Sequence, residues 1–343
     1  MTAPAAPQVP PAASSHEAWR RLWATGVTDT FGDNPQPGAG PAARPPLAEH
    51  WLGWLARHVP QGARVLDLGT GNGALPRWLL QACPTLPLHC DGVDVVPVHP
   101  AWVANLPAAQ RAQLQFHAGV SAAQLPFESG RYDLVLSQYG LEYAGWPHAL
   151  PEALRMLAPG GRLALALHHA ASRPARLAHE EIRHAQWLLQ SGWLDAATQM
   201  AQALSLLGSE SGRQALAREP RWAAVRQQFD RWQQDLRELG DDSVCPDLLY
   251  DAQHWCTQAF RVSAEQGAGA GQAAMVRLSQ QVQDTQARLQ DLLAHVLDEA
   301  QFQTVCQQVA EAGLTVHEAR SLHDGGHLMG WWLSAQRPGS ALD

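Results

Sequence analysis

The stretch that decides the fold is Arg64-Val-Leu-Asp-Leu-Gly-Thr-Gly-Asn-Gly73. Val65, Leu66 and Leu68 form a short apolar run, which is typical of a strand buried on both faces of a parallel sheet. Three glycines at alternate positions follow this run, and apolar residues then recur at helical spacing over residues 74–80. Because glycine has no Cβ, such a turn lets a ligand approach the backbone, and the N–H groups at the helix start face that ligand. Strand, glycine turn and helix together predict a nucleotide-type cofactor site.

The spacing of the glycines and the flanking acids narrow the kind of cofactor. The glycines read G-x-G-x-G, not the dinucleotide fingerprint G-x-G-x-x-G, and no Lys-Ser/Thr pair follows them as in a phosphate-binding P-loop. Asp67 lies inside the strand, where a carboxylate would repel a pyrophosphate but suit a cationic ligand. The next apolar run, over residues 88–94, ends in Asp94, which is well placed for two ribose hydroxyls.

These residues resemble the class I S-adenosylmethionine (SAM)-dependent methyltransferases. Residues 131–138 resemble the fourth-strand motif of that family, and residues 155–167 resemble its helix, Pro-Gly-Gly turn and fifth strand. The four motifs follow one another in the family's order. The resemblance implies an α/β, Rossmann-like fold with a seven-stranded, mostly parallel sheet and helices on both faces. This chain adds a large helical insertion between the fifth and sixth strands.

The resemblance also implies that SAM is the cofactor, and it assigns roles to the matching positions. Asp67 and the glycine turn would line the methionine and ribose portion, and Asp94 would bind the ribose hydroxyls. Where the family commonly has an acidic residue near the adenine, this chain has Ser121, whose hydroxyl accepts a hydrogen bond more weakly than a carboxylate. The predicted cofactor-binding residues are Asp67, Gly69, Thr70, Gly71, Gly73, Asp94, Val95, Ser121, Ser137 and Gln138.

The acceptor site and a catalytic base are predicted at the ends of the fourth and fifth strands, because parallel α/β sheets bind ligands beyond the carboxyl ends of their strands. Tyr139, Glu142 and Tyr143 follow the fourth strand. Alternatively, the two tyrosines lie four apart on a helix and face the core. His168 and His169 end the fifth strand and suit proton transfer. Alternatively, both imidazoles hydrogen-bond the start of the inserted segment. The predicted catalytic residues are His168, His169, Tyr139 and Glu142.

The 343 residues are expected to form one enlarged domain with an insertion. An Ala/Pro-rich leader, expected to be disordered, and a short tail flank the folded part. In many relatives a short N-terminal helix closes over the cofactor; on the pattern alone, a helix merely packed on the core fits equally well. The insertion is expected to form a lid over the acceptor that holds Trp187, Trp193, Trp222, Trp232 and Trp255. The predicted boundaries are leader 1–15, N-terminal helix and Pro/Gly-rich connector 16–47, SAM-binding core 48–171 and 299–337, helical insertion 172–298, and tail 338–343.

Composition argues against several classes of protein. No apolar run approaches the ~20 residues of a membrane span, and no signal peptide is evident, so a cytoplasmic protein is expected. The net charge of −8 argues against a nucleic-acid substrate, and the absence of lysine excludes a lysine base. The five cysteines form no C-x-x-C pair. No metal is predicted, because residues 179–184 are one residue too long for H-E-x-x-H, and His323 and His327 lack an evident third ligand.

The predicted function is methyl transfer from SAM to a small, apolar or aromatic metabolite, with O-methylation favoured. The protein would hold donor and acceptor in line and remove a proton. Fourteen tryptophans favour an apolar or aromatic acceptor. Two alternatives stay open. One is SAM-dependent methylation of RNA or protein, which the acidic charge opposes. The other is a non-catalytic scaffold with a degenerate SAM site, whose helical insertion would bind a partner or a second copy in a homodimer.

Overall fold

A computed structural model of the chain describes residues 14–28, 30, 45, 47–98 and 100–339. Most of the predicted leader, connector and tail therefore lies outside the described residues. The chain divides into two compact units, each described here by itself. The sheet unit comprises Trp19–Arg176 and Asp291–Asp343, and the helical unit comprises Met1–Ala18 and Leu177–Gln290.

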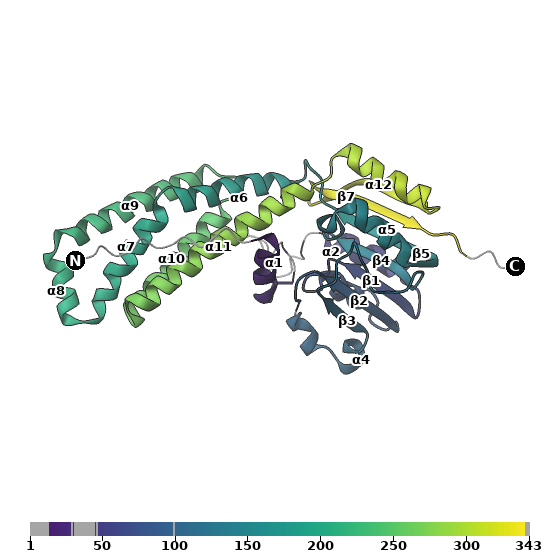
Figure 1. The fold of residues 1–343 in the computed structure, drawn as a ribbon, viewed down its shortest axis with the longest axis horizontal. Helices are drawn as coiled ribbons and strands as arrows, with labels where there is room; N and C mark the ends of the chain where they lie inside the picture. Colours follow the sequence, from purple (N-terminus) through teal and green to yellow (C-terminus); the bar gives the residue numbers. More distant parts are fainter. Residues whose placement is uncertain (1–13, 29, 31–44, 46, 99, 340–343) are drawn as a thin grey trace. The chain divides into compact units, whose positions relative to one another are not determined.

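The sheet unit is built on seven strands (Figure 1). They are β1 (Ala63–Leu68), β2 (Leu88–Asp94), β3 (Leu114–Ala118), β4 (Tyr132–Gln138), β5 (Leu157–Leu167), β6 (Thr315–Asp324) and β7 (His327–Gln336). Their order across the sheet is β3-β2-β1-β4-β5-β7-β6. The five strands from β1 to β5 run parallel to their neighbours, and β7 pairs antiparallel with both β5 and β6. The predicted seven-stranded, mostly parallel sheet is confirmed.

The strand order reverses at β1. From β1 the chain proceeds to β2 and β3 on one side and then returns to place β4 on the other. Such a switch point leaves a crevice outside the carboxyl ends of the two central strands, which is where open α/β sheets bind ligands. The glycine turn follows β1 directly, so it lies at this edge of the sheet.

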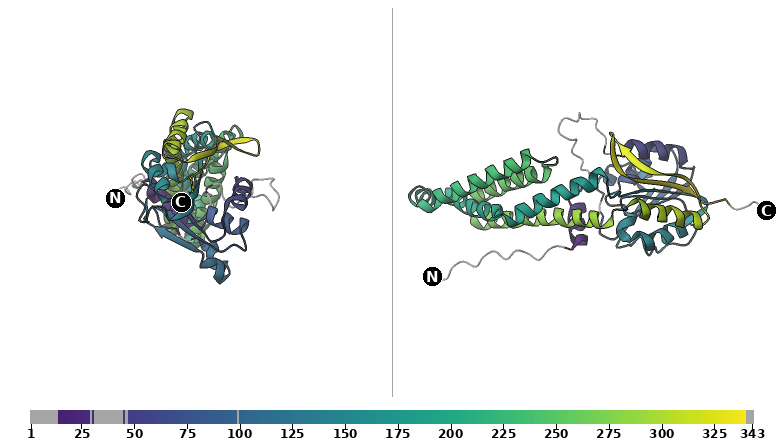
Figure 2. Two further views of the ribbon diagram at one scale, coloured as in Figure 1. Left: turned by 90° about the vertical axis from the view of Figure 1, so that its right-hand side faces the viewer. Right: turned by 90° about the horizontal axis from the view of Figure 1, so that it is seen from above.

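Helices cover both faces of the sheet (Figures 1 and 2). The helices α2 (Ala48–His58) and α3 (Ala74–Ala82) share one core cluster, whereas α5 (Trp146–Met156) and α12 (Glu299–Glu311) share the other. Val65 packs in the first cluster, and Leu66 and Leu68 pack in the second. Because side chains alternate along a strand, a run that is apolar on both sides can bury both of its faces.

The helical unit is formed from helices joined by short turns. In chain order the elements are α6 (Arg173–Gln190), α7 (Trp193–Ser205), η3 (Leu206–Gly208), α8 (Glu210–Arg218), α9 (Pro220–Asp241), α10 (Asp247–Gln266) and α11 (Ala268–His295). Several boundaries fall at a glycine or proline: Gly192 precedes α7, Gly208 ends η3, Pro220 begins α9 and Gly267 precedes α11. The first residues of α6 and the last of α11 belong to the sheet unit, so the helical unit is shorter than the predicted insertion at both ends. Among the described residues, no helix is long and apolar enough to cross a bilayer.

Four of the five tryptophans predicted in the insertion contribute to the core of the helical unit. Trp193 is fully buried in that core, and Trp187, Trp232 and Trp255 pack against it. Burying an aromatic side chain contributes a few kcal/mol to stability. These side chains therefore stabilise the helical unit, whatever its relation to the acceptor.

Candidate active site

The glycine turn packs directly against the loop that follows β4. Gly69 has φ +67°, and a Cβ at this position would lie 2.6 Å from the Cα of Gly140. Only glycine combines the left-handed conformation with so close a backbone approach. The ends of β1 and β4 are therefore held together by backbone contact.

Asp94 closes the glycine turn from the neighbouring strand. Its Oδ2 accepts a hydrogen bond from the N–H of Gly71 at 2.9 Å, and its Oδ1 accepts one from the N–H of Val96 at 3.1 Å. Charge-assisted bonds of this kind fix the backbone firmly. The predicted acid at the end of β2 thus contacts the predicted turn.

Asp67 lies beneath the turn in an unusual electrostatic position. It is 2% exposed, and burial raises its pKa to about 7, with the nearby Asp94 acting in the same direction. A buried carboxylate without a compensating cation is costly. Its place beside a predicted ligand site fits a role in holding a cationic ligand.

The helix α1 (Ser15–Ala24) ends against the glycine turn. A Cβ at Gly71 would lie 2.8 Å from the indole of Trp23. The side-chain amide of Asn72 donates to the backbone oxygens of Trp23 and Val27, at 2.9 and 2.7 Å. Of the two interpretations of the N-terminal segment, these contacts favour the one in which it lies over the predicted cofactor turn. Sequence reasoning missed Asn72, although it stands between two of the glycines.

Ser137 joins the ends of the two central strands. Its hydroxyl donates to the backbone oxygen of Leu68 at 2.8 Å and accepts from the N–H of Leu141 at 2.9 Å. The next residue, Gln138, has an enclosed Oε1 with no hydrogen-bond partner among the described residues. Ser137 thus positions the loop after β4, and Gln138 has an acceptor available for a ligand.

The remaining predicted cofactor residues lie at the same edge of the sheet or beside it. Thr70 is buried within the turn, and Val95, directly after β2, is 46% exposed. Ser121 is half-buried, and its hydroxyl accepts from the N–H of Ala123 at 3.2 Å. The hydroxyl oxygen can accept a second hydrogen bond, and its role near the adenine remains a prediction.

Glu142 lies enclosed in the short helix η2 (Leu141–Ala144). It is 1% exposed, and its Oε1 accepts from the backbone N–H of His168 at 2.8 Å. Its Oε2 has no hydrogen-bond partner among the described residues. Burial raises the pKa of Glu142 to about 7, against the opposing effects of backbone hydrogen bonds at His168, Glu142 and Gly140 and of the nearby His295. The group is therefore balanced between its charged and neutral forms near neutral pH.

His168 is the second enclosed polar side chain of this cluster. It is 4% exposed, stacks on Tyr139 at 4.1 Å between ring centroids, and has its Nε2 3.2 Å from the hydroxyl of Tyr143. Burial, reinforced by the nearby His295, lowers its pKa to about 3, so the imidazole is neutral at pH 7. Its Nδ1 has no partner among the described residues.

His169 points to different neighbours. Its ring stacks on Trp331 at 4.1 Å between centroids, and its Nδ1 accepts from the N–H of Ala171 at 2.8 Å. These contacts fit the alternative in which the imidazole of His169 hydrogen-bonds the start of the inserted segment. The two histidines are adjacent in sequence, but only His168 contacts Glu142 and Tyr143.

The two tyrosines do not share a helix. Tyr139 has φ +52° and precedes η2, and its hydroxyl donates to the backbone oxygen of Met329 at 2.9 Å. The alternative that places Tyr139 and Tyr143 four apart on one helix is therefore wrong. Gly140 packs against the glycine turn, so the chain must change direction sharply after β4. The left-handed backbone conformation of Tyr139 makes this change of direction.

Two residues at the end of α11, missed in the sequence, join this cluster. His295 Nδ1 lies 3.3 Å from Oδ1 of Asp291, and the His295 ring is 5.0 Å from that of Tyr143. The hydrogen bond to Asp291 raises the pKa of His295. Trp19 donates from its indole N–H to Oδ2 of Asp291 at 2.8 Å. No motif marks these residues, because the cluster forms only when distant segments meet.

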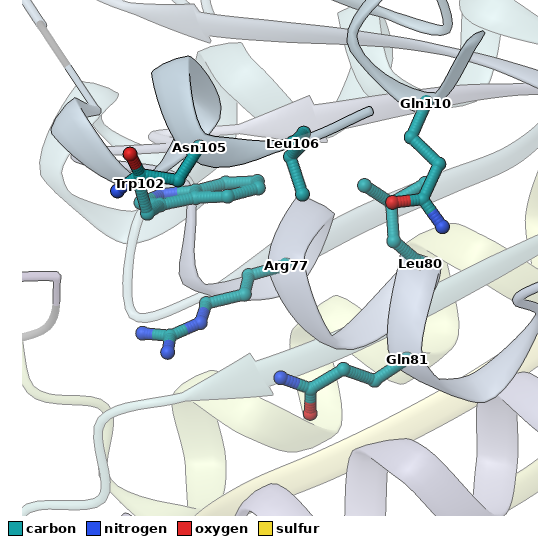
Figure 3. A pocket seen from close by; sticks show the side chains of 7 residues that line it. All are labelled: Arg77, Leu80, Gln81, Trp102, Asn105, Leu106 and Gln110. Atoms are coloured by element: carbon teal, nitrogen blue, oxygen red, sulfur yellow. The ribbon is translucent and has the colours of Figure 1, made fainter. Parts of the chain in front are cut away.

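A surface pocket of about 320 Å³ lies beside this edge (Figure 3). Its lining comes from α3, the short helix η1 (Ala101–Asn105) and the region of α4 (Ala108–Arg111). Trp102 lines it and donates from its indole N–H to the backbone oxygen of Asn72 at 2.8 Å. No predicted site residue lines this pocket, which is formed by Arg77, Leu80, Gln81, Trp102, Asn105, Leu106 and Gln110.

The helical unit holds a separate polar group. The thiol of Cys245 donates to Oε1 of Glu181 at 3.1 Å and lies 3.5 Å from Oδ2 of Asp247. Burial and these carboxylates raise the pKa of the thiol, so it stays protonated at neutral pH. All five cysteines of the chain are free. The group is explained by its own hydrogen bonds.

Comparisons with known proteins cover the segments from which this site is built. Residues 65–161 match the family model described as a methyltransferase domain. The chain is 36% identical over 101 residues to the demethylmenaquinone methyltransferase of Thermus thermophilus, covering 29% of this chain and 44% of that protein. It is 32% identical over 145 residues to the 2-phytyl-1,4-naphtoquinone methyltransferase of Thermosynechococcus vestitus, covering 42% and 59%. It is 34% identical over 113 residues to the dimethylglycine N-methyltransferase of Parasynechococcus marenigrum, covering 33% and 40%.

The chain spans about half the length of these curated relatives. The matched region contains most of β1, the glycine turn, Asp94 and the loop after β4, which are the parts that meet at the carboxyl edge of the sheet. On the motifs, the sheet order and these matches, residues 65–161 are similar to the methyltransferase domain of class I SAM-dependent methyltransferases.

Proposed function

We propose that this protein transfers the methyl group of SAM to a small-molecule acceptor, with transfer to a hydroxyl oxygen favoured. One observation carries the proposal. The glycine turn, the Asp94 carboxylate and the enclosed pair Glu142 and His168 meet at one edge of the sheet. A cofactor cradle and a buried carboxylate that can accept a proton, side by side, are the two parts that such a transfer needs.

The residues at the turn fit SAM. At Gly71, where the indole of Trp23 lies against the turn, no side chain of the turn itself blocks a ligand. Asp67 and Asp94 provide carboxylates for a cationic, ribose-bearing ligand. When bound, SAM supplies an electrophilic methyl group on a sulfonium. Asp94 would hold the ribose hydroxyls, and the turn would hold the methionine portion.

The acceptor is proposed to be aromatic. Trp19 stacks with Trp23 at 5.9 Å and meets Tyr143 edge-on at 5.6 Å, so aromatic rings line the region between the turn and the Glu142 cluster. Flat aromatic ligands pack well on such rings. Two of the curated relatives are named for methylating quinone-type compounds, which supports this choice. The relative named for an N-methyltransferase makes an amine acceptor the second candidate.

Proton removal is proposed to involve the predicted cluster after β4 and β5. A hydroxyl acceptor must lose its proton as the new bond forms, and the chain has no lysine to receive it. Among the two predicted histidines, His168 lies beside Glu142 and Tyr143. Once an acceptor is known, His168→Ala should cut turnover by ~10²-fold and change the acid limb of the pH–rate profile, while SAM binding persists. Normal turnover in both His168→Ala and His169→Ala would show that neither histidine is needed for proton removal.

The first test is calorimetry with SAM and with its demethylated product, S-adenosylhomocysteine. The wild type should bind both with dissociation constants on the order of micromolar. Asp94→Ala should weaken binding by tenfold or more, because the turn loses its closing carboxylate. Gly71→Val should do the same, because its side chain meets Trp23. The exposed Glu128→Gln is the matched control. A wild type that binds neither compound would favour the scaffold alternative.

The second test identifies the acceptor class. The protein is incubated with radiolabelled SAM and a cell extract, and the products are fractionated by size. Label in the small-molecule fraction supports the proposal, whereas label in RNA or protein supports the macromolecular alternative. The acceptor lid, the homodimer and the cytoplasmic location stay predictions, and sedimentation of the purified protein would check the homodimer.

A further inference from the structure

Two enclosed polar atoms lie in the cluster after β4 with no partner among the described residues. They are Oε2 of Glu142 and Nδ1 of His168, on side chains that are 1% and 4% exposed. An unpaired buried polar atom costs about 1–3 kcal/mol, so each is a candidate for contact with a ligand when it lies beside a binding site. The bond from the His168 N–H to Oε1 of Glu142 places the two groups together.

Their position in the fold is next to the cofactor turn. Glu142 follows Gly140 by two residues, and the Cα of Gly140 is pressed against Gly69. Ser137 ties the same loop to the last residue of β1. The free oxygen of Glu142 is therefore anchored to the end of β1, where the glycine turn begins.

The charged surroundings leave Glu142 sensitive to a nearby cation. His168, at the end of β5, is neutral, and burial raises the pKa of Tyr139 and Tyr143 well above neutrality. From α11, His295 acts on Glu142 as a positive charge when protonated, but Asp291 lies against His295 and offsets it. No arginine forms an ion pair with Glu142 among the described residues.

We propose that Glu142 accepts the proton released in methyl transfer, and that the positive charge of bound SAM holds Glu142 in its ionised form. This inference rests on the proposed function. In the step, the bond from the methyl carbon to sulfur breaks with its electron pair on sulfur. The bond from the acceptor oxygen or nitrogen to that carbon forms, and the acceptor's proton passes to Oε2 of Glu142. The sulfonium of SAM and the carboxylate of Glu142 both become neutral in this step, so the atoms balance and the total charge is unchanged.

This arrangement couples the base to the cofactor's charge. While the sulfonium is present, its field favours the carboxylate, which is then ready to take a proton. After transfer the cation is gone, and burial again favours the neutral carboxyl group, which retains the proton. His168 would position Glu142 through its backbone N–H, and its Nδ1 would hold the acceptor.

The test measures protons released on ligand binding, by calorimetry at pH 7 in two buffers of different ionisation enthalpy. SAM should release more protons than S-adenosylhomocysteine, because only SAM carries the sulfonium charge. Glu142→Gln should remove up to ~0.5 proton of this difference, since a group with a pKa of about 7 is half protonated at pH 7. Asp67→Asn is the matched comparison. The pKa of Asp67, like that of Glu142, is about 7, so this variant removes the other buried carboxyl group that titrates near pH 7. A difference unchanged by Glu142→Gln would overturn the inference.

A second measurement does not depend on the folding of Glu142→Gln. In Asp67→Asn, the ratio of the dissociation constant of S-adenosylhomocysteine to that of SAM should rise severalfold between pH 6 and pH 8, as Glu142 ionises. A flat ratio would overturn the inference while leaving cofactor binding established. A wild type that binds neither compound would instead overturn the proposed function, so the two failures are distinguishable.

Discussion

The side-chain amide of Asn72 donates a hydrogen bond of 2.9 Å to the backbone oxygen of Trp23. The same nitrogen donates to Val27 at 2.7 Å, so one buried side chain fastens the end of α1 to the glycine turn. The two partners of the first bond are 49 residues apart in sequence. This contact seats the indole of Trp23 against Gly71, which gives the N-terminal segment a defined place beside the predicted cofactor site.

Asn72→Ala is expected to release that segment. The variant loses two hydrogen bonds to backbone carbonyls, which should lower the free energy of unfolding by about 1–3 kcal/mol. Hydrogen exchange of residues 19–27 should become faster, as the local opening free energy falls. The exposed Asn105→Ala is the control and should change neither quantity. Unaltered exchange in Asn72→Ala would show that Trp23 is held by its ring contacts alone.

Gly69→Ala is expected to damage the junction of β1 and β4. The new Cβ would lie 2.6 Å from a backbone atom of Gly140, and the residue would have to keep φ +67°. Gly62→Ala separates the two effects, because Gly62 has φ +75° with nothing within 4 Å of a Cβ. It should cost about 1 kcal/mol of unfolding free energy from backbone strain alone. Denaturant midpoints measure both, and equal losses would mean that the loop after β4 moves aside freely.

Asp67→Asn is expected to stabilise the fold while weakening SAM binding. Burial raises the pKa of Asp67 to about 7, above its unfolded value. Wild-type stability is therefore highest when this group is protonated, and it falls as the pH rises from about 4 through 7, by up to ~4 kcal/mol. The amide cannot ionise, so the variant's advantage in unfolding free energy should grow over that range and level off above it. Urea unfolding at pH 4, 6 and 8 checks this, and an advantage that does not grow with pH would contradict it.

Asp91→Asn is expected to show the opposite dependence on pH. Burial would raise the pKa of Asp91, but hydrogen bonds from His117 and Tyr132, at 2.7 and 2.9 Å, together with the nearby His89, hold it below its ordinary value. A depressed pKa contributes stability above the unfolded pKa of ~3.9, and that stability is lost as the pH falls through the folded value. The variant should lose roughly 1.5–3 kcal/mol at pH 7 and a smaller amount near pH 3.

The control for Asp91→Asn is the exposed Glu128→Gln, whose stability should follow the wild type across the same pH range. A loss in Asp91→Asn that is equally large at pH 3 and pH 7 would point to packing, because protonation removes the charge in the wild type at low pH. Unfolding free energies at both pH values decide between these explanations.

The sequence by itself determined the strand, the glycine turn, the order of the motifs and the breaks between the helices of the insertion. These features depend on local spacing, since an apolar run over residues 65–68 or a glycine at position 267 acts through its own backbone and near neighbours. The seven-stranded, mostly parallel sheet followed from the family resemblance, and the structure confirms it and supplies the order of the strands. The position of Asp94 at the site was also predictable, because Asp94 ends β2, the strand that pairs with β1.

Only the tertiary structure decided how the side chains of the site meet. Trp19 and Asp291 form a hydrogen bond across 272 residues of sequence, and no local pattern brings them together. His168 and His169 look equivalent in the sequence, yet successive side chains at a strand end point in opposite directions, so one contacts Glu142 and the other stacks on Trp331. Burial then sets the charges: the raised pKa of Glu142 and the lowered pKa of His168 both come from desolvation, which depends on the packed neighbours of each group.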